Sequence, residues 1–600
     1  MKTLRLLVRI LALPLLGLVA CANPGTPMGG PKDEKPPVVK RSVPAQNALG
    51  YNKKEISIEF DELIQLKDVN QKLVVSPPFN KQPSAVARGN ELVVVMDEDL
   101  QENTTYTFDF ADAITDNNEG NVLQNFRFSF STGQVVDSLS ISGTLFQATD
   151  LTPVSSALVF IHSNLADTAL QTLVPIRLAK TDDKGHFSIR NVSPGKYKLY
   201  ALEDANRNYK YDQPGERIAW LDSLVVPSFE YREAIDSIAP DSTVTRNVLA
   251  YVPDSLRLFL FAEDQPTQYR TGDARKERAR IDVTFKRRAE EFSVQPIGED
   301  VGPGWALWEQ SVGGDSISVW LTSKELYEKD TLRFAISYAM LDSLKKPFVK
   351  TDSLSFFFFE VGEKKRKKDS DKEEKPSLAV GDLKSTIDFF SSLSFSIPTA
   401  PVEINRQSIK VFELVDSIKN EIPFTFVHDS LYIRRFSINS DWKVGTAYEL
   451  NIDSAAFRDV YGIVNKNITH KFSIRNLDSY GTVYATVTDP QPNWLLQMLD
   501  GKDQVVRQAL VPARGKLAFR YLVPAEYMFR IVVDKNGNGG WDTGNLAKGV
   551  QPETLYYYHD KVAVRANWEH EVDFNPHEFD IYKFTEKFRK SQKQTSGGRR

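Results

Sequence analysis

Phe126-Arg127-Phe128-Ser129-Phe130 alternates a phenylalanine with a polar residue over five positions. Successive side chains of a β-strand point to opposite faces, so this spacing places three aromatic rings on one buried face of a sheet. Tyr106-Thr107-Phe108-Asp109-Phe110 and Ile56-Ser57-Ile58-Glu59-Phe60 have the same period of two, and turn residues separate the runs. Short alternating strands joined by turns predict an antiparallel β-sandwich.

The same period continues through most of the 600-residue chain. Tyr197-Lys198-Leu199-Tyr200-Ala201-Leu202 and Ser316-Ile317-Ser318-Val319-Trp320-Leu321 predict buried strands in two further segments. No helical pattern of comparable quality interrupts these strands. A chain of this length is too long for a single hydrophobic core and is expected to form about four domains. We therefore predict an all-β, multi-domain chain.

The second half of the chain repeats the first half. Three anchor residues of one segment recur at a constant offset of 342: Tyr106 as Tyr448, Gly120 as Gly462 and Phe130 as Phe472. Four anchor residues of the next segment recur at an offset of 330: Gly185 as Gly515, Pro194 as Pro524, Tyr197 as Tyr527 and Asp204 as Asp534. Two domain types therefore occur twice in the same order, with a third domain between the copies. Repeated β modules are typical of binding and scaffold proteins.

Both repeated segments resemble known families. Residues 56–132, with Thr105-Tyr106-Thr107-Phe108 near their end, resemble the bacterial Ig-like domain of S-layer proteins and of many Bacteroidota lipoproteins. Gly185-His186-Phe187 followed by Pro194-Gly195-Lys196-Tyr197 resembles carboxypeptidase-regulatory-like modules of the transthyretin type. In the second copy, Leu517 replaces the phenylalanine and Ala525 replaces the turn glycine. The resemblance implies extracytoplasmic β-sandwiches without catalysis.

The N-terminus has the layout of a secretory signal peptide: a basic start, the apolar run 10–19, and small residues before Cys21. Cys21 is the single cysteine of the chain, and its setting resembles the lipobox cleaved by signal peptidase II. Lipidation of Cys21, with several acyl chains such as palmitate, would anchor the protein durably. Ala22, in place of Asp, favours the outer membrane. A transmembrane anchor or an uncleaved signal is the alternative, although the apolar run is short for a membrane span.

The predicted organisation has nine segments. They are a lipoprotein signal peptide at 1–20, a Pro/Gly tether at 21–37, an Ig-like domain at 38–134, a transthyretin-like or carboxypeptidase-regulatory-like domain at 135–226, a central β-sandwich at 227–362, a charged linker at 363–376, a second Ig-like domain at 377–477, a second transthyretin-like domain at 478–575 and a basic disordered tail at 576–600. The tether is rich in Pro and Gly and the linker mixes charges of both signs, so neither can form a core.

Two loops at equivalent positions of the repeat carry oxygen-bearing side chains at loop positions 1, 3, 5 and 9. This spacing is typical of the first part of a Ca²⁺ loop. A carboxylate at position 12 is absent from both loops, but Glu216 follows at position 13 of the first and Asn545 stands at position 12 of the second. The candidate ligands are Asp204, Asn206, Asn208, Asp212 and Glu216 in the first loop, and Asp534, Asn536, Asn538 and Asp542 in the second. We expect a structural Ca²⁺ ion that stiffens each loop and lets it present Tyr209 and Tyr211, or Trp541; an Asx-rich hairpin held by its own hydrogen bonds is the alternative.

The sequence contains no catalytic constellation. Its net charge of −4 argues against a nucleic-acid partner, its seven histidines lack metal-ligand spacing, and neither a Gly-x-Ser-x-Gly elbow nor a phosphate-binding loop is present. We therefore predict a non-enzymatic outer-membrane lipoprotein without a small-molecule substrate, which serves as a binding or scaffold subunit of an envelope complex. An accessory role beside outer-membrane β-barrel proteins, including their assembly, is the specific expectation, and Lys32-Asp33-Glu34 favours the cell surface over the periplasmic face. A cell-surface adhesin or glycan-binding protein, and a hydrolase with a site between domains, are the alternatives.

Overall fold

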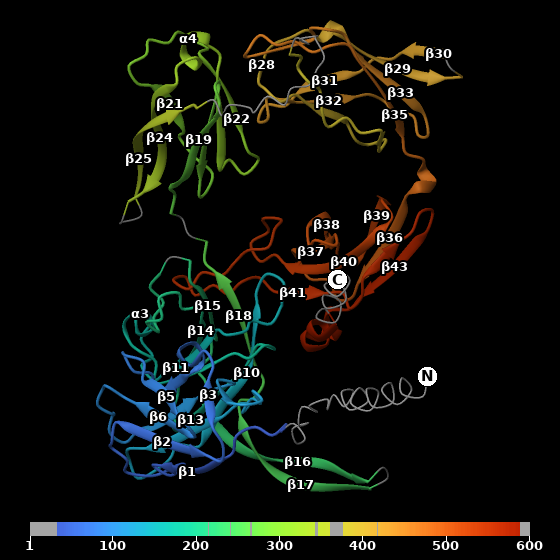
Figure 1. Cartoon of the computed structure of the whole chain (residues 1–600). Helices are drawn as coiled ribbons and strands as arrows, with labels where there is room; N and C mark the ends of the chain where they lie inside the picture. The colour runs from blue at the N-terminus through green and yellow to red at the C-terminus, as the bar shows by residue number, and fades with distance from the viewer. Residues whose placement is uncertain are drawn as a thin grey trace, which may run out of the picture. The chain divides into compact units, whose positions relative to one another are not determined.

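The computed structural model describes residues 33–213, 215–239, 242–264, 267–342, 346–359, 376–416 and 418–587 (Figure 1). Regular structure in these ranges is almost entirely β-strand, which confirms the all-β, multi-domain prediction. The chain divides into two compact units, Met1–Glu263 and Asp264–Arg600. The predicted signal peptide, Cys21, residues 22–32 of the tether, residues 363–375 of the linker and residues 588–600 lie outside the described residues. None of the helices in the described ranges is long and apolar enough to cross a membrane.

The first Ig-like domain packs antiparallel sheets around an aromatic core. One sheet has the order β1-β2-β6-β5, with β1 at Val39–Val43, β2 at Glu55–Phe60, β6 at Glu91–Val95 and β5 at Ser84–Arg88. The other strands are β4 (Val74–Ser76), β7 (Thr105–Asp109) and β9 (Arg127–Ser131), which form one sheet, and β3 (Ile64–Leu66) and β8 (Ile114–Asp116), which pair, with α2 (Val69–Lys72) between β3 and β4. The alternating aromatic residues face inward as expected, because the Tyr106 and Phe130 rings stack with centroids 5.7 Å apart.

The second domain is built on one seven-stranded sheet with the order β12-β11-β14-β15-β18-β10-β13. Its elements are β10 (Leu139–Gln147), β11 (Leu158–His162), α3 (Ala169–Thr172), β12 (Arg177–Lys180), β13 (His186–Val192), β14 (Lys198–Leu202), β15 (Arg217–Trp220) and β18 (Leu256–Ala262). β10 and β18 run parallel, with Gly143 opposite Leu256. Glycine is required there because a Cβ at residue 143 would lie 2.2 Å from the Leu256 carbonyl oxygen.

β18 corrects the predicted boundary between residues 226 and 227. The sequence pattern assigns 256–261 to the central sandwich, yet Leu258 and Leu260 lie in the core of the preceding domain. The alternating pattern identifies β18 as a strand but does not show which strand it pairs with. The pairing was missed because a hairpin separates β18 from β15 in the chain. This hairpin consists of β16 (Ser228–Ala239) and β17 (Ser242–Val252) and lies outside the seven-stranded sheet (Figure 1).

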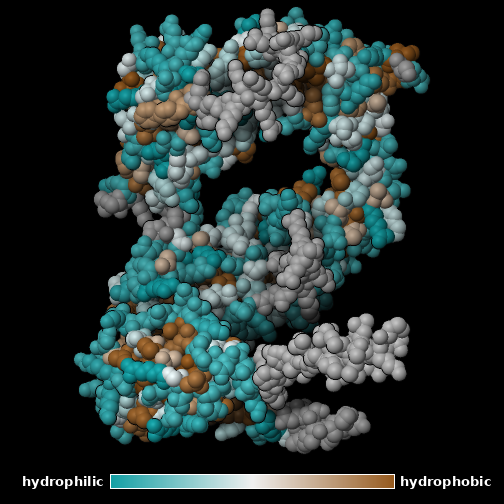
Figure 2. Space-filling view, in the orientation of Figure 1, coloured by the Kyte–Doolittle hydropathy of each residue, from teal (hydrophilic) through white to brown (hydrophobic). Residues whose placement is uncertain are grey.

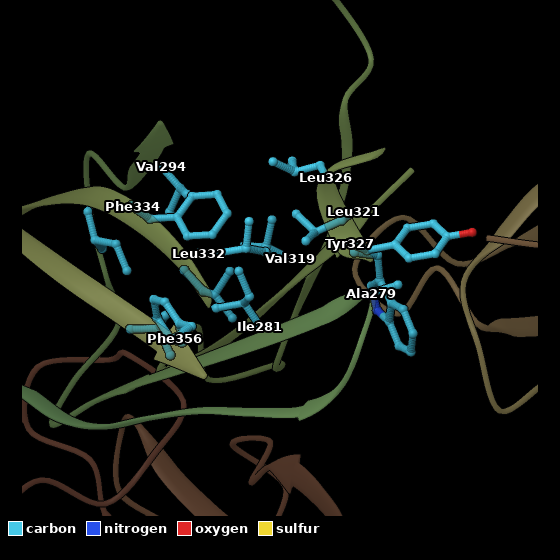
Figure 3. Packing of buried hydrophobic residues seen from close by; sticks show 14 of the residues in the cluster. Ala279, Ile281, Val294, Val319, Leu321, Leu326, Tyr327, Leu332, Phe334 and Phe356 are labelled. Atoms are coloured by element: carbon cyan, nitrogen blue, oxygen red, sulfur yellow. The ribbon is translucent and has the colours of Figure 1, made fainter. Parts of the chain in front are cut away.

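The central sandwich, in the second unit, consists of a four-stranded and a three-stranded sheet. The first has the order β19-β20-β23-β22 and the second the order β21-β24-β25. The bounds are β19 Arg270–Glu277, β20 Arg280–Phe285, β21 Ser293–Pro296, β22 Ala306–Gln310, β23 Ser316–Leu321, α4 Lys324–Tyr327, β24 Thr331–Leu341 and β25 Pro347–Phe357. Figure 3 shows the core between the sheets, where Val319 and Phe334 are fully buried.

The second Ig-like domain has the sheet plan of the first. β29-β33-β35 correspond to β4-β7-β9, β27-β32-β31 correspond to β2-β6-β5, and β28 pairs with β34 as β3 pairs with β8. The bounds are β26 Thr386–Ile387, β27 Leu393–Ser396, β28 Pro401–Ile404, η2 Arg406–Ser408, β29 Ile409–Val415, β30 Ile418–Glu421, β31 Thr425–His428, β32 Arg435–Asn439, β33 Ala447–Ile452, β34 Phe457–Asp459 and β35 Ile468–Ile474. The Tyr448 and Phe472 rings stack at 5.6 Å and 22°, compared with 5.7 Å and 22° for Tyr106 and Phe130. The repeat read from the sequence therefore corresponds to a repeated fold.

The last domain has the strand order of the second domain, but its strands form two sheets, β39-β36-β43 and β38-β37-β40-β41 with β42 beside β40. β36 pairs antiparallel with β39 and parallel with β43, as β10 pairs with β13 and β18. The bounds are η3 Leu477–Ser479, β36 Gly481–Val487, β37 Trp494–Leu499, β38 Val505–Leu510, β39 Lys516–Leu522, β40 Ala525–Val533, β41 Leu555–Tyr557, β42 Val562–Val564, β43 Glu569–Phe574 and η4 Pro576–Glu578.

The expected disordered tail at 576–600 is wrong in its first part. Residues 581–587 form a helix, in which Ile581 and Thr585 are buried, and the Phe584 ring stacks on Tyr557 with centroids 4.6 Å apart. The spacing of residues 581, 584 and 585 places them on one helical face, which is the signal that the basic composition concealed. The ordered domain therefore extends to at least residue 587.

Candidate functional site

The first Asp/Asn loop connects β14 to β15, and one carboxylate closes its first turn. Asp204 Oδ1 accepts from the backbone N–H of Arg207 at 2.6 Å and of Asn208 at 3.2 Å, and Asp204 Oδ2 accepts from Tyr209 N–H at 2.7 Å. Arg207 and Tyr209 both adopt the left-handed conformation, with φ of 60° and 62°. This conformation costs a non-glycine residue about 1–2 kcal/mol. The loop therefore keeps a shape that its own residues disfavour.

The other predicted ligands of the first loop gather around Asp212. Asn206 Nδ2 donates to Asp212 Oδ1 at 3.0 Å, and Asn208 Nδ2 donates to Asp212 Oδ2 at 2.6 Å. Glu216 is buried, and its carboxylate accepts from Ala205 N–H at 3.0 Å and from Asp212 N–H at 3.2 Å. All five predicted residues of this loop thus belong to one network.

The second loop connects β40 to β41 and repeats this network. Asp534 accepts from Gly537, Asn538 and Gly539 N–H at 2.7, 3.2 and 2.8 Å. Asn536 and Asn538 each donate through Nδ2 to Asp542 Oδ2 at 2.6 Å. Gly537 and Gly539 have φ of 73° and 85°, so glycines occupy the two positions that Arg207 and Tyr209 hold in the first loop. The two loops share one backbone shape.

Glu553 completes the second loop and was not among the predicted residues. Its carboxylate accepts from Lys535 N–H at 2.7 Å and from Asp542 N–H at 3.1 Å, as Glu216 does from Ala205 and Asp212. Asp534 lies 330 positions after Asp204 and Glu553 lies 337 after Glu216, so seven inserted residues hide the match from a fixed spacing. Asn545, which stands at the expected spacing, instead accepts from Lys548 N–H at 2.9 Å within the inserted turn.

Electrostatics distinguishes Glu553 among these groups. Burial raises the pKa of Glu553, the Lys535 and Asp542 N–H groups lower it, and the nearby Asp534 and Asp542 carboxylates raise it further. Like charges gathered around a buried carboxylate are the arrangement that a bound cation would relieve.

A cation in these loops would need the amide side chains as ligands. In the described residues no group of three or more His, Cys, Asp and Glu side chains is placed to hold a metal ion. Both asparagines of each loop donate to the aspartate through Nδ2, while their Oδ1 atoms accept backbone N–H groups two residues further on, at 3.2 and 2.8 Å in the first loop and at 3.0 and 2.9 Å in the second. An ion would therefore displace the Nδ2 donors from the aspartate and use the remaining lone pairs of the carboxylate and amide oxygens, which are hard-oxygen donors of the kind that Ca²⁺ takes.

The aromatic residues of the loops are anchors rather than presented groups, which corrects the expectation for Tyr211 and Trp541. Tyr211 is buried and its hydroxyl donates to Glu263 Oε2 at 2.8 Å. Trp541 Nε1 donates to the Glu553 carbonyl oxygen at 2.9 Å. Tyr211 therefore holds its loop against the residues that follow β18, and Trp541 ties two parts of its own loop together.

Two surface features lie outside the loops. An open groove of about 510 Å³ in the second Ig-like domain is lined by charged and hydroxyl side chains, among them Lys384, Arg435 and Ser394. In unit 1, Figure 2 shows hydrophobic residues gathered on a visible face of the first Ig-like domain. Leu63, Val86 and Val95 are exposed on this domain, at 50%, 48% and 36% of their surface.

Comparison with known proteins places one of these domains in a family. Residues 33–132 match the family model of the bacterial Ig-like domain, which confirms the prediction for the first domain. No curated protein matches the chain.

Three solved structures give alignments with low overall similarity. BcpA, the major pilin subunit of Bacillus cereus, is 9% identical with a TM-score of 0.14, and the alignment covers 73% of this chain and 98% of the pilin. The MG0-NIE-MG1 part of α2-macroglobulin from Escherichia coli is 10% identical, with a TM-score of 0.17 and coverage of 48% and 96%. The S-layer protein rSbsC(31-844) is 8% identical, with a TM-score of 0.13 and coverage of 88% and 67%. At these TM-scores the resemblance carries no argument about function.

Proposed function

We propose that this protein is a non-catalytic outer-membrane lipoprotein that acts as a binding or scaffold subunit of an envelope complex. The observation that carries the proposal is the duplicated pair of β-sandwich modules, whose neighbours are joined by polar contacts. In unit 1, Leu178 N–H donates to Ser76 Oγ at 3.1 Å, and Thr107 Oγ1 donates to Asn191 Oδ1 at 3.1 Å. Such junctions oppose independent motion of the two domains.

A stronger junction joins the central sandwich to the second Ig-like domain in unit 2. Arg434 holds the buried carboxylate of Glu309 through two hydrogen bonds of 2.7 and 2.9 Å, and Ala279 N–H donates to the Tyr461 hydroxyl at 3.0 Å. Paired, buried contacts of this kind fix one orientation, because any other orientation leaves a charge without its partner. Modules held at fixed spacing suit a protein that braces other proteins.

Lipid at Cys21 would supply the membrane attachment, with the cell surface as the favoured side. The apolar residues that gather on the visible face of the first Ig-like domain in Figure 2 support a protein partner, since exposed apolar patches mark interaction sites, and Leu63, Val86 and Val95 are among the exposed apolar residues of this domain. The specific form that we propose is an accessory role beside outer-membrane β-barrel proteins, including their assembly. This last step rests on the class of the protein and not on a residue.

Within this function we assign the two loops a structural Ca²⁺ ion each. The support is that both copies form the same hydrogen-bonded network although their sequences differ. In the first loop Arg207 and Tyr209 adopt the left-handed conformation, and in the second a seven-residue insertion precedes Glu553. Backbone strain persists only where the surroundings impose it. The ion would stiffen the loop and would take no part in a reaction.

Co-purification tests the proposed role. The tagged full chain is expected to carry a reproducible β-barrel partner when it is extracted from outer membranes with mild detergent. A variant with Leu63→Ser, Val86→Ser and Val95→Ser should lose that partner and keep its fold, whereas Val505→Ser, at a comparably exposed valine in unit 2, should retain it. Recovery of the unaltered chain without any partner from native membranes would refute the scaffold proposal.

A cell-surface adhesin or glycan-binding protein is the second candidate, and the open groove of the second Ig-like domain favours it. The groove combines hydroxyl groups and charges of both signs with the apolar Ile387 and Phe395, a mixture that suits a sugar ring with its hydroxyl edge and apolar face. A glycan array probed with the full chain, with Arg435→Ala as the groove variant, distinguishes the two functions. Binding that depends on Arg435 supports the adhesin.

A further inference from the structure

The hairpin of β16 and β17 pairs with no sheet of its domain, although the end of β17 that joins β18 lies beside β10. Its strands span twelve and eleven residues and pair with each other from Ser228 opposite Val252 to Ala239 opposite Ser242. Among the described strands, neither pairs with a third. Figure 1 shows the hairpin, in green, extending away from the seven-stranded sheet. An isolated two-stranded hairpin is marginally stable in water and gains stability when a further strand pairs with it.

The second copy of the module shows that the fold does not need the hairpin. The pairs Tyr197 with Val225 and Tyr527 with Val562 are equivalent, and so are the parallel pairs Gly143 with Leu256 and Ala485 with Val572. The connection between these points has 30 residues in the first copy, 226–255, and nine in the second, 563–571. Both copies nevertheless form the same parallel pair, although the seven strands make one sheet in the first copy and fall into two sheets in the second, where β41 and β43 belong to different sheets. The hairpin is therefore an addition to the module rather than part of its fold.

One face of the hairpin is apolar and continues the core of the domain into solvent. Phe229 lies opposite Tyr251, and Tyr231 lies opposite Leu249, so all four side chains share one face. Tyr251 packs partly against the core, whereas Phe229, Tyr231 and Leu249 are 57%, 70% and 47% exposed. The opposite face carries Glu230 and Arg232, of which Arg232 bonds Glu230 and Asp254. The apolar face is confined to the base of the hairpin, since Glu233 and Asn247 continue the same face toward the tip.

The two edges of the hairpin differ as well. β16 has three charged residues within four positions, Glu230, Arg232 and Glu233, and charged side chains are the usual protection of a free edge. The last six residues of β17, Asn-Val-Leu-Ala-Tyr-Val at 247–252, contain no charge, no proline and no glycine. A segment of that composition with a free edge is prone to pair with another strand. The open edge is therefore that of β17.

We propose that the free edge of β17 receives an extended strand of a partner protein, with apolar side chains at alternate positions and basic side chains between them. Main-chain hydrogen bonds would form along the edge, and the alternate apolar side chains would pack beside Leu249 and Tyr231. This inference is independent of the lipid anchor and of the proposed scaffold role.

The net charge of the hairpin and the area of its face both favour a single basic strand as the binding partner. Residues 228–252 contain four acidic and two basic residues, a net charge of −2, which favours a basic strand and disfavours an anionic lipid surface. One face of the hairpin covers only about 350 Å², from about 3.3 Å per residue along the strand and about 4.8 Å between strands. A stable interface between two folded copies needs about 800 Å² per partner. A single added strand fits the available surface, and a second copy docked on this face does not.

Peptide binding to the full chain tests the proposal. The probe is a fluorescent ten-residue peptide of alternating Val and Lys, and the control peptide has proline in place of two central valines. We expect saturable binding by fluorescence anisotropy for the first peptide and at least tenfold weaker binding for the second, since proline cannot pair along the edge. Hydrogen exchange at residues 245–252 should slow when the first peptide is bound.

Variants locate the site. Tyr231→Ser with Leu249→Ser should weaken binding at least tenfold, and replacement of residues 226–255 by the second-copy connection 563–571 should abolish it while the sheet stays protected from exchange. Leu510→Ser, at an exposed leucine on the edge strand β38, is the matched control and should change nothing. Equal binding of the proline peptide, protection elsewhere than β17, protection by phosphatidylcholine vesicles alone, or a hairpin-dependent dimer in sedimentation would each overturn the proposal.

Discussion

Replacing Arg434, whose guanidinium pairs with Glu309, tests whether the central sandwich and the second Ig-like domain are held in one fixed orientation. The carboxylate of Glu309 in β22 is 6% exposed, accepts two hydrogen bonds from Arg434, and accepts a third from Trp320 Nε1 at 3.1 Å. Burial alone would lower the pKa of Arg434, but the hydrogen bonds and charge of Glu309 outweigh burial and raise it. Arg434 therefore depends on the Glu309 carboxylate to offset the cost of its burial.

Arg434→Met leaves the Glu309 carboxylate buried with one neutral donor. Leaving a buried charge unpaired costs about 3–5 kcal/mol. Glu309→Gln keeps the shape and the Trp320 hydrogen bond, and it leaves Arg434, whose side chain is 25% exposed, partly hydrated. We expect this variant to cost about 1–2 kcal/mol, and the double variant to cost clearly less than the sum of the two, because no isolated charge remains.

Hydrogen exchange of the amides in β22 and β32 measures these costs as local opening free energies, without requiring a two-state transition of a multi-domain chain. Faster exchange should be confined to this junction, and unit 1 should be unaffected. Additive costs of the two single changes, or an Arg434→Met variant as protected as the unaltered chain, would mean that the ion pair does not fix the junction.

Three further changes probe the anchor, the loops and one buried histidine. Cys21→Ala should move the protein from the membrane to the soluble fraction with its β circular dichroism spectrum unchanged; unfolding of that variant would contradict a purely anchoring role. Calcium should release heat in calorimetry and raise the melting temperature by several degrees, and Asp534→Ala with Asp204→Ala should remove both responses. His162 is buried beside Phe160 and Tyr200, and burial lowers its pKa to about 4 from the ordinary value of 6.5. The unfolded chain then binds the extra proton first, so stability should fall as pH drops from about 6.5 to 4, by about 3 kcal/mol in total. In His162→Phe that part of the acid sensitivity should disappear, and an unchanged pH profile would assign it to other groups.

The sequence predicted the architecture well because strand alternation and repeat offsets survive in a single chain. Tyr106 and Phe130 could be paired with Tyr448 and Phe472 from spacing alone, and their ring geometries agree. Strand pairing could not be predicted, since β18 reaches its parallel partner β10 across a hairpin that alternation does not reveal. The helix at 581–587 was missed because basic composition masked its apolar face. In the loops, the spacing selected four residues in each copy and Glu216, which the structure joins in one hydrogen-bonded network per loop, whereas Glu553 lies beyond an insertion that a fixed spacing excludes.

The differences between the two copies of the module distinguish features that the fold requires from features that were added to one copy. Arg207 and Tyr209 hold the loop in a conformation that glycines at 537 and 539 adopt freely, and Glu553 returns to its place despite seven added residues. A loop preserved against both obstacles belongs to the module itself, and its role is to support the sheet ends in each copy. The hairpin of β16 and β17 behaves in the opposite way, since one copy has it and the other forms the equivalent parallel pair without it. Loss of the loops should therefore weaken a module, whereas loss of the hairpin should leave the module intact and remove a contact with another protein.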